Sequence, residues 1–192
     1  MTGTTMRLKL IHKIPTFGKT TAMLPDLSRT ATFYHGYISL VPQPDLVEAF
    51  AIHTGRFYQL LESIPAELRD YRYAPEKWTI RDVLQHVIDA ERVFAYRALC
   101  FARKSPALLP GFDENLFAAN AKAGSRHWED MVNEFKNIRE SSRLMFASFD
   151  EEQLESGGIA NNSPTYVRAL GYTLLGHVSH HVNILEERYL SH

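Results

Sequence analysis

Hydrophobic residues recur at steps of three and four along most of the chain after residue 43, the spacing that places side chains on one helix face. The first such stretch covers residues 46–64, where Asp45 can cap the start and Pro65 ends the pattern. Its inward positions are Leu46, Phe50, His53, Phe57, Leu60, Leu61 and Ile64. The pattern predicts an amphipathic helix over these residues.

A second long helix is predicted over residues 80–103. Thr79 precedes it and Asp82 stands three residues later, so the two resemble a capping box, in which each side chain bonds the other residue's backbone N–H. Pro106 comes shortly after the last periodic residue and cannot continue a helix.

Two more long helices are predicted over residues 125–148 and 163–190, and a short one over residues 114–121. Ser163 can cap the last helix, and Pro164 would stand at its first position, where no N–H is needed. We find no convincing strand pair and no internal repeat. Four long amphipathic helices joined by polar loops predict an all-α four-helix bundle.

The first part of the chain has a different character. Residues 1–43 are rich in Thr, carry scattered Pro and Gly, and show no sustained helical period. We expect an N-terminal extension that is irregular or partly disordered, followed by one bundle domain over residues 44–192.

Composition and charge exclude several classes of protein. The formal net charge is -1, from 21 basic and 22 acidic residues, which gives no electrostatic reason to expect binding to nucleic acid. No run approaches the ~18 apolar residues of a membrane span. Cys100 is the single cysteine, so no intrachain disulfide can form. Because no secretory signal is found either, we expect a cytoplasmic protein.

Three of the nine histidines stand out by position. His177 and His181 are four residues apart on the last predicted helix, so their imidazoles share one face within reach of a single ion. His86 lies on the second long helix. The neighbours at helical spacing are apolar: Val83, Val87, Ala90 and Phe94 around His86, and Leu170, Leu174 and Leu185 around the pair. We therefore expect all three imidazoles to point into the bundle.

A buried imidazole needs a partner for its polar nitrogens. A divalent metal would satisfy three at once, since neutral imidazole is a good ligand for zinc, nickel and similar ions. Three protein ligands leave one position open for water or substrate, as in catalytic sites. The spacing leaves two alternatives open: His177 and His180 as the binding pair, or histidines that only form hydrogen bonds.

Two segments resemble the DinB-like family, the bacterial superfamily of damage-inducible DinB proteins and low-molecular-weight-thiol transferases. Residues 77–92, KWTIRDVLQHVIDAER, are similar to its second helix, with Trp-Thr ahead of the first histidine. Residues 167–190, VRALGYTLLGHVSHHVNILEERYL, are similar to its final helix. The resemblance covers roughly residues 35–190.

The resemblance implies a four-helix bundle with a metal at one end, usually as a homodimer. The family's metal ligands fall on His86, His177 and His181, and the ion would be a divalent transition metal such as zinc, nickel or manganese. Members with an assigned activity are largely thiol S-transferases of the bacillithiol type, and others are described as metal-dependent hydrolases. The substrate would be a small molecule, with a low-molecular-weight thiol as one candidate.

Two reactions are compatible with such a site: attack by a thiolate or attack by hydroxide. Asp89, three residues after His86, could orient a ligand or move a proton, or could pair with Arg92 on the helix surface. A non-catalytic metal- or ligand-binding stress-response protein is the alternative to an enzyme.

Overall fold

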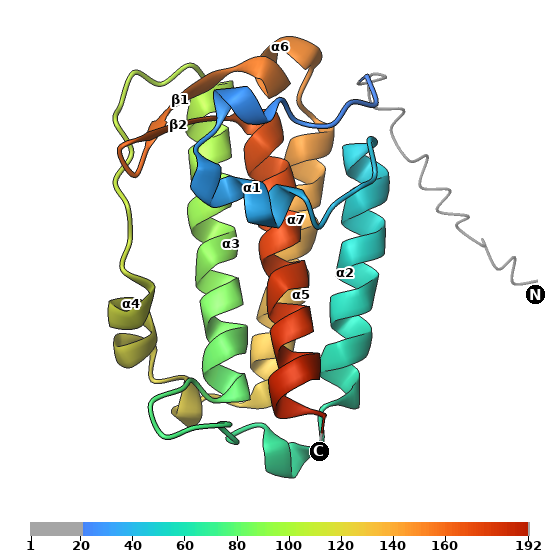
Figure 1. Ribbon diagram of the computed structural model, residues 1–192, viewed down its shortest axis with the longest axis vertical. Coiled ribbons are helices and arrows are strands. Elements are labelled where there is room, and N and C mark those ends of the chain that lie inside the picture. The colour runs from blue at the N-terminus through green and yellow to red at the C-terminus, as the bar shows by residue number, and fades with distance from the viewer. Residues whose placement is uncertain (1–20, 192) are drawn as a thin grey trace, which may run out of the picture.

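Four long helices lie side by side and form the body of the protein (Figure 1). The computed structural model describes residues 21–191. The four helices are α2 (Leu46–Ser63), α3 (Ile80–Ala102), α5 (Trp128–Ala147) and α7 (Val167–Ile184). The predicted helical bundle is therefore confirmed.

Neighbouring helices α3 and α5 run in the same direction, so a long crossover joins the end of one to the start of the other (Figure 1). This crossover contains α4 (Glu114–Ala121) and a short 3-10 helix, Ala123–Ser125. Helix α7 runs antiparallel to α3, packs against it, and continues as one turn of π-helix, Leu185–Tyr189.

Side-chain caps fix the helix starts that the sequence predicts. Asp45 accepts a hydrogen bond from the backbone N–H of Glu48 at 2.9 Å. Thr79 Oγ1 accepts from the N–H of Asp82 at 3.1 Å, and Asp82 accepts from the N–H of Thr79 at 3.0 Å. Each bond satisfies an N–H that has no partner within the helix. The predicted capping box is confirmed, and it sets the register that points His86 inward.

The predictions of a helix starting at Ser163 and of no strand pair are wrong. The residues ahead of α7 form a hairpin, with β1 (Gly157–Ala160) antiparallel to β2 (Ser163–Tyr166). The last long helix therefore begins at Val167.

The turn of this hairpin explains the difference. Asn161 and Asn162 have φ angles of 52° and 56°, the left-handed values that a two-residue hairpin turn requires and that asparagine tolerates. Pro164 lies opposite Ile159 in a ladder of only two strands, where a missing N–H is tolerated. The Ser-Pro pair that resembles a helix start is thus the first half of a strand.

Part of the segment predicted to be irregular is helical. Helix α1 (Thr32–Ile38) lies across α7 and buries Tyr34 and Ile38 against the bundle (Figure 1). The contact is close because Gly176 of α7 has no Cβ where α1 crosses. The expectation of disorder at residues 1–20 concerns positions outside the described residues.

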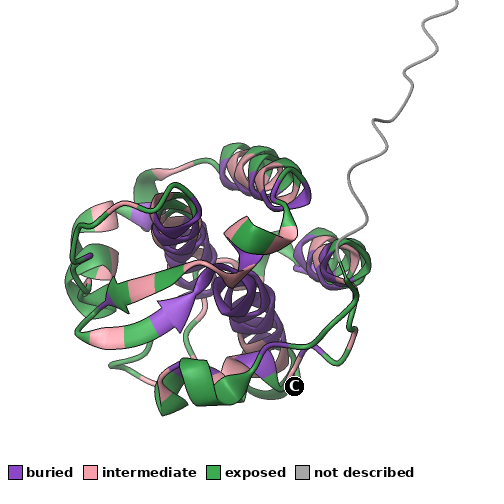
Figure 2. Cartoon of the chain, turned by 90° about the horizontal axis from the view of Figure 1, so that it is seen from above, coloured by how far each residue is buried: buried purple, intermediate pink, exposed green. Residues whose placement is uncertain are grey.

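Helix α7 forms the centre of the molecule. Every residue from Val167 to Ser179 is buried, and Figure 2 shows this helix enclosed by the others. One hydrophobic cluster includes Leu175 and another includes Val178, so the two clusters meet at the level of His177. The histidines therefore lie between two well-packed regions of the core.

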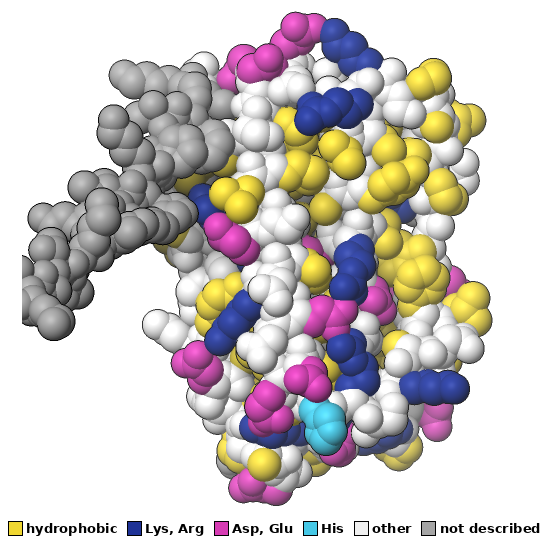
Figure 3. Space-filling model, turned by 180° about the vertical axis from the view of Figure 1, so that it is seen from behind, with side chains coloured by type: hydrophobic (Ala, Val, Ile, Leu, Met, Phe, Trp, Pro, Cys, Tyr) yellow, Lys and Arg dark blue, Asp and Glu magenta, His cyan; other side chains and the backbone are white. Residues whose placement is uncertain are grey.

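Shorter elements close the ends of the bundle: the 3-10 helices Leu27–Arg29 and Ala66–Leu68, and α6 (Glu151–Glu155). On the face seen in Figure 3, basic and acidic side chains lie interspersed. Among the helices of residues 21–191, none combines the length and the apolar character that a membrane crossing requires.

Candidate metal centre

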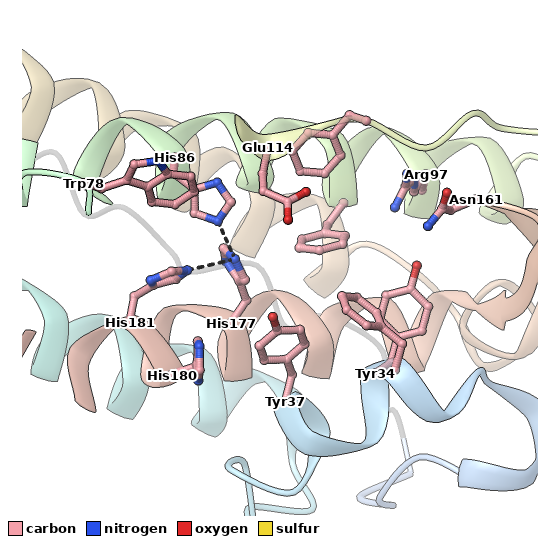
Figure 4. A pocket seen from close by; sticks show the side chains of 13 residues that line it. Tyr34, Tyr37, Trp78, His86, Arg97, Glu114, Asn161, His177, His180 and His181 are labelled. Atoms are coloured by element: carbon pink, nitrogen blue, oxygen red, sulfur yellow. Dashed lines mark hydrogen bonds between the residues drawn. The ribbon is translucent and has the colours of Figure 1, made fainter. Parts of the chain in front are cut away.

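The three predicted ligands meet inside the bundle. His86 from α3 and His177 and His181 from α7 bring their imidazole rings together (Figure 4). The Nε2 atom of His177 lies 2.9 Å from that of His86 and 3.2 Å from that of His181. The four-residue step aligns the two rings of α7, and the packing of α3 on α7 supplies the third.

This arrangement fits a bound cation better than hydrogen bonds among the rings. The Nε2 atom of His177 carries either one N–H or one lone pair, so it cannot satisfy both of its short contacts. A cation that accepts three lone pairs removes the conflict. Metal–nitrogen bonds of about 2.0–2.1 Å at angles of roughly 90–110° place ligand nitrogens about 2.9–3.4 Å apart, which agrees with both distances. The donor set therefore suits a divalent transition metal.

The electrostatic environment keeps these rings neutral. Burial lowers the pKa of His86 to about 4, against a smaller opposite effect of the Glu114 carboxylate. Burial also holds the pKa values of His177 and His181 well below the usual range, and the neighbouring histidines lower them further. Neutral imidazole is the form that binds a metal, so the fold itself prepares the ligands near pH 7.

His180 lies beside the three-histidine cluster and does not belong to it. Its ring is partly buried and meets the edge of the Tyr37 ring at a centroid distance of 5.5 Å. Trp78 covers the other side of the cluster, with its ring centre 4.8 Å from that of His86. The structure thus brings together the His177/His181 pair and leaves the alternative pair with His180 apart.

A cavity of about 260 Å³ opens from the three histidines and extends along α3. The histidines line one end, and Arg97 and Asn161 line the other (Figure 4). Mostly aromatic side chains form the wall between the two ends: Phe33, Tyr34, Tyr37, Phe94 and Phe112. The cavity has room for a small molecule with polar groups at its two ends and an apolar middle.

Glu114 is a site residue that the sequence analysis does not identify. It is the first residue of α4, and its carboxylate points into the cavity towards the histidine end (Figure 4). Asp113 caps the same helix by accepting hydrogen bonds from two backbone N–H groups, which fixes where Glu114 stands. An acidic residue in the first turn of a helix is common, so nothing in the sequence marks this one.

Asp89, the predicted catalytic residue, lies outside this cavity. It accepts a hydrogen bond from Gln85 Nε2 at 3.0 Å and lies 3.8 Å from Arg92. It lines a separate surface hollow that also contains Arg126. The structure therefore brings the three predicted metal ligands together and leaves Asp89 apart from them.

Comparisons with known proteins agree with this architecture. A model of the DinB superfamily matches residues 49–185. A solved structure of YfiT from Bacillus subtilis, described as "a probable metal-dependent hydrolase with an unusual four-helix bundle topology", matches with a TM-score of 0.64 at 15% sequence identity. The match covers 87% of this chain and 91% of that one. A search of curated proteins found no match.

Proposed function

The chain belongs to the DinB superfamily, and we propose that it is a metal-dependent hydrolase of a small molecule. In this proposal His86, His177 and His181 hold one divalent transition metal. The observation that carries it is the convergence of the Nε2 atoms of three buried, neutral imidazoles at one end of the cavity. The activity named for the YfiT structure belongs to the same class.

The cavity supplies what hydrolysis needs beside the metal. When bound, a divalent metal supplies Lewis acidity, which makes water a stronger acid and polarises a carbonyl group. We assign Glu114 the role of general base, because its carboxylate faces the histidine end and can accept a proton from water there. Trp78 and Tyr37 cover the histidines and limit access of bulk solvent.

The first experiment measures metal content. Purified wild-type protein should contain about one zinc, nickel or manganese ion per chain, and the His86→Ala/His177→Ala/His181→Ala variant should contain none. His127→Ala is the matched control, because His127 lies at the start of α5 away from the cluster. Wild-type protein that takes up no metal would contradict the proposed site.

The second experiment measures turnover of the metal-loaded protein. We expect hydrolysis of activated esters or amides, with activity lost in the triple variant while its helical circular dichroism signal remains. Thiol transfer, implied by the family resemblance, would instead appear as consumption of an electrophile only when a low-molecular-weight thiol is added. Metal binding with neither activity would support the non-catalytic alternative.

The predicted homodimer and cytoplasmic location extend this proposal. Light scattering coupled to size-exclusion chromatography measures the molar mass directly, and a value near twice 22.0 kDa would support the dimer. Fractionation of the source cell would test the location.

A further inference from the structure

Arg97 is a buried cation at the end of the cavity opposite the histidines. Only 3% of its surface is exposed. It stands eleven residues after His86 on α3, about three helical turns, so both side chains arise from the same face of the helix. Figure 4 shows its guanidinium at the far end of the cavity, beside Asn161.

Arg97 differs from the other deeply buried arginines in its partners. Arg139 lies 2.8 Å from a carboxylate oxygen of Glu91, and Arg168 forms ion pairs with Glu151 and Glu155. Arg97 has no ion pair among the described residues. Within residues 21–191, its one hydrogen bond goes from Nη2 to the backbone oxygen of Pro110 at 2.8 Å.

Burying a charge without a partner costs desolvation free energy. A fold retains such a charge mainly where an opposite charge or hydrogen bonds offset that cost. The ring of Phe94, 5.9 Å from the guanidinium carbon, gives only weak compensation. Burial lowers the pKa of Arg97, which is a sign of this cost, although an arginine stays protonated near pH 7. Arg97 lines the cavity, so an anion bound there could accept hydrogen bonds from N–H groups of the guanidinium that the protein leaves free.

The neighbours of Arg97 complete a site for an anion. Asn161 reaches the cavity from the hairpin turn, and Gly111 leaves the room that its side chain occupies. Leu109 binds the hairpin through two backbone hydrogen bonds, so the crossover and the hairpin hold this end together. Tyr34 lines the same end of the cavity and offers a hydroxyl.

We infer that Arg97 and Asn161 bind a carboxylate of the substrate while its reactive group lies at the three histidines. A planar guanidinium matches a carboxylate through two parallel hydrogen bonds, and one cation balances one negative charge. Because aromatic rings separate the two ends, the substrate class is an ester or amide with an apolar chain that ends in a carboxylate. The identity of the reactive group rests on the proposed hydrolase function, but the carboxylate site does not.

A binding experiment tests the carboxylate site without turnover. The His86→Ala/His177→Ala/His181→Ala protein is titrated calorimetrically with hexanoate and with hexanamide. This variant is used because it offers no metal that could compete for the anion. We expect hexanoate to bind roughly tenfold to a hundredfold more tightly than hexanamide, and Arg97→Met to abolish the difference. Arg97→Lys, which keeps the charge, should retain part of it. Arg103→Met, at an exposed position at the end of the same helix, is the control.

A turnover experiment on the metal-loaded protein gives the second test. The half-ester mono-p-nitrophenyl adipate carries a carboxylate, and methyl p-nitrophenyl adipate is its neutral match. The wild type should prefer the half-ester by about tenfold or more in kcat/KM, and Arg97→Met should lose this preference while it still hydrolyses the neutral ester.

The outcomes separate the two proposals. Hydrolysis of both esters with equal kcat/KM, together with equal binding of hexanoate by the three-histidine variant with and without Arg97→Met, would overturn the carboxylate site and leave the hydrolase intact. Selective binding of hexanoate without hydrolysis of either ester would overturn the hydrolase and support the carboxylate site.

Discussion

The backbone oxygen of Tyr37 lies directly over the Cα atom of Gly176, where any larger residue would place its Cβ. A Cβ built on Gly176 would lie 1.9 Å from that oxygen. This contact seats α1 on α7 and holds the Tyr37 ring 5.4 Å from the ring of His177. A single missing methyl group thus positions one wall of the candidate site.

We expect Gly176→Ala to lower the free energy of unfolding by about 1–3 kcal/mol, because α1 must move away from α7 to make room. Urea unfolding measures the change. Gly55→Ala is the matched control, since nothing lies within 4 Å of a Cβ built there and Gly55 stands within α2. That substitution should raise stability by about 0.5–1 kcal/mol. Equal changes in the free energy of unfolding for Gly176→Ala and Gly55→Ala would contradict the close contact between α1 and α7.

Glu114→Gln should lower kcat by about 10²-fold to 10⁴-fold while metal content stays at the wild-type level, because the amide cannot accept the proton. Steady-state kinetics beside elemental analysis checks both parts. Asp89→Asn, at the catalytic position that the sequence predicts, is measured under the same conditions. If Asp89→Asn removes the activity and Glu114→Gln does not, the role belongs to Asp89.

Glu91 and Arg139 form a buried ion pair between α3 and α5, with 1% and 2% of their side chains exposed. Either Glu91→Gln or Arg139→Met alone should destabilise the protein by about 3–5 kcal/mol, because each leaves a buried polar or charged group without its partner. The Glu91→Gln/Arg139→Met double variant should have a higher free energy of unfolding than the more destabilised of the two single variants. A double-mutant cycle of urea unfolding measures this coupling, and additive single effects would argue against it.

His53 should make stability depend on pH. Its Nδ1 lies 2.6 Å from Ser179 Oγ and its Nε2 lies 3.0 Å from Gln43 Oε1, and burial lowers its pKa below 6.5. The unfolded chain therefore binds a proton at higher pH than the folded one. The stability contributed by neutral His53 is complete above about pH 6.5 and is lost as pH falls towards the folded pKa.

The difference in unfolding free energy between wild type and His53→Gln isolates this effect from that of other histidines. We expect the difference to be constant between pH 7 and 8 and to shrink below about pH 6.5. A difference that stays constant down to pH 5 would mean that the pKa of His53 is the same in the folded and unfolded chains.

The sequence by itself determined the long helices and the three histidines. Helical spacing and capping are local, so residues within one or two turns contain the information. The Thr79–Asp82 box set the start of α3, and the apolar neighbours of His86 set its inward direction. The step between His177 and His181 fixed their common face in the same way.

The local sequence pattern predicted the wrong element where the same residues suit two kinds of secondary structure. Ser163-Pro164 suits a helix start and equally suits an edge strand, and the choice depended on the left-handed backbone of Asn161 and Asn162. Helix α1 is short and weakly periodic, so its stability comes from burial of Tyr34 and Ile38 against α7.

Only the tertiary structure decided the rest of the cavity. Glu114 comes from the crossover between α3 and α5, Asn161 from the hairpin, and Tyr37 from α1. These segments meet because α7 lies at the centre of the bundle and each of them contacts α7 or its neighbour α3. Contacts between residues so distant in the chain depend on packing and burial, which have no periodic signature in the sequence.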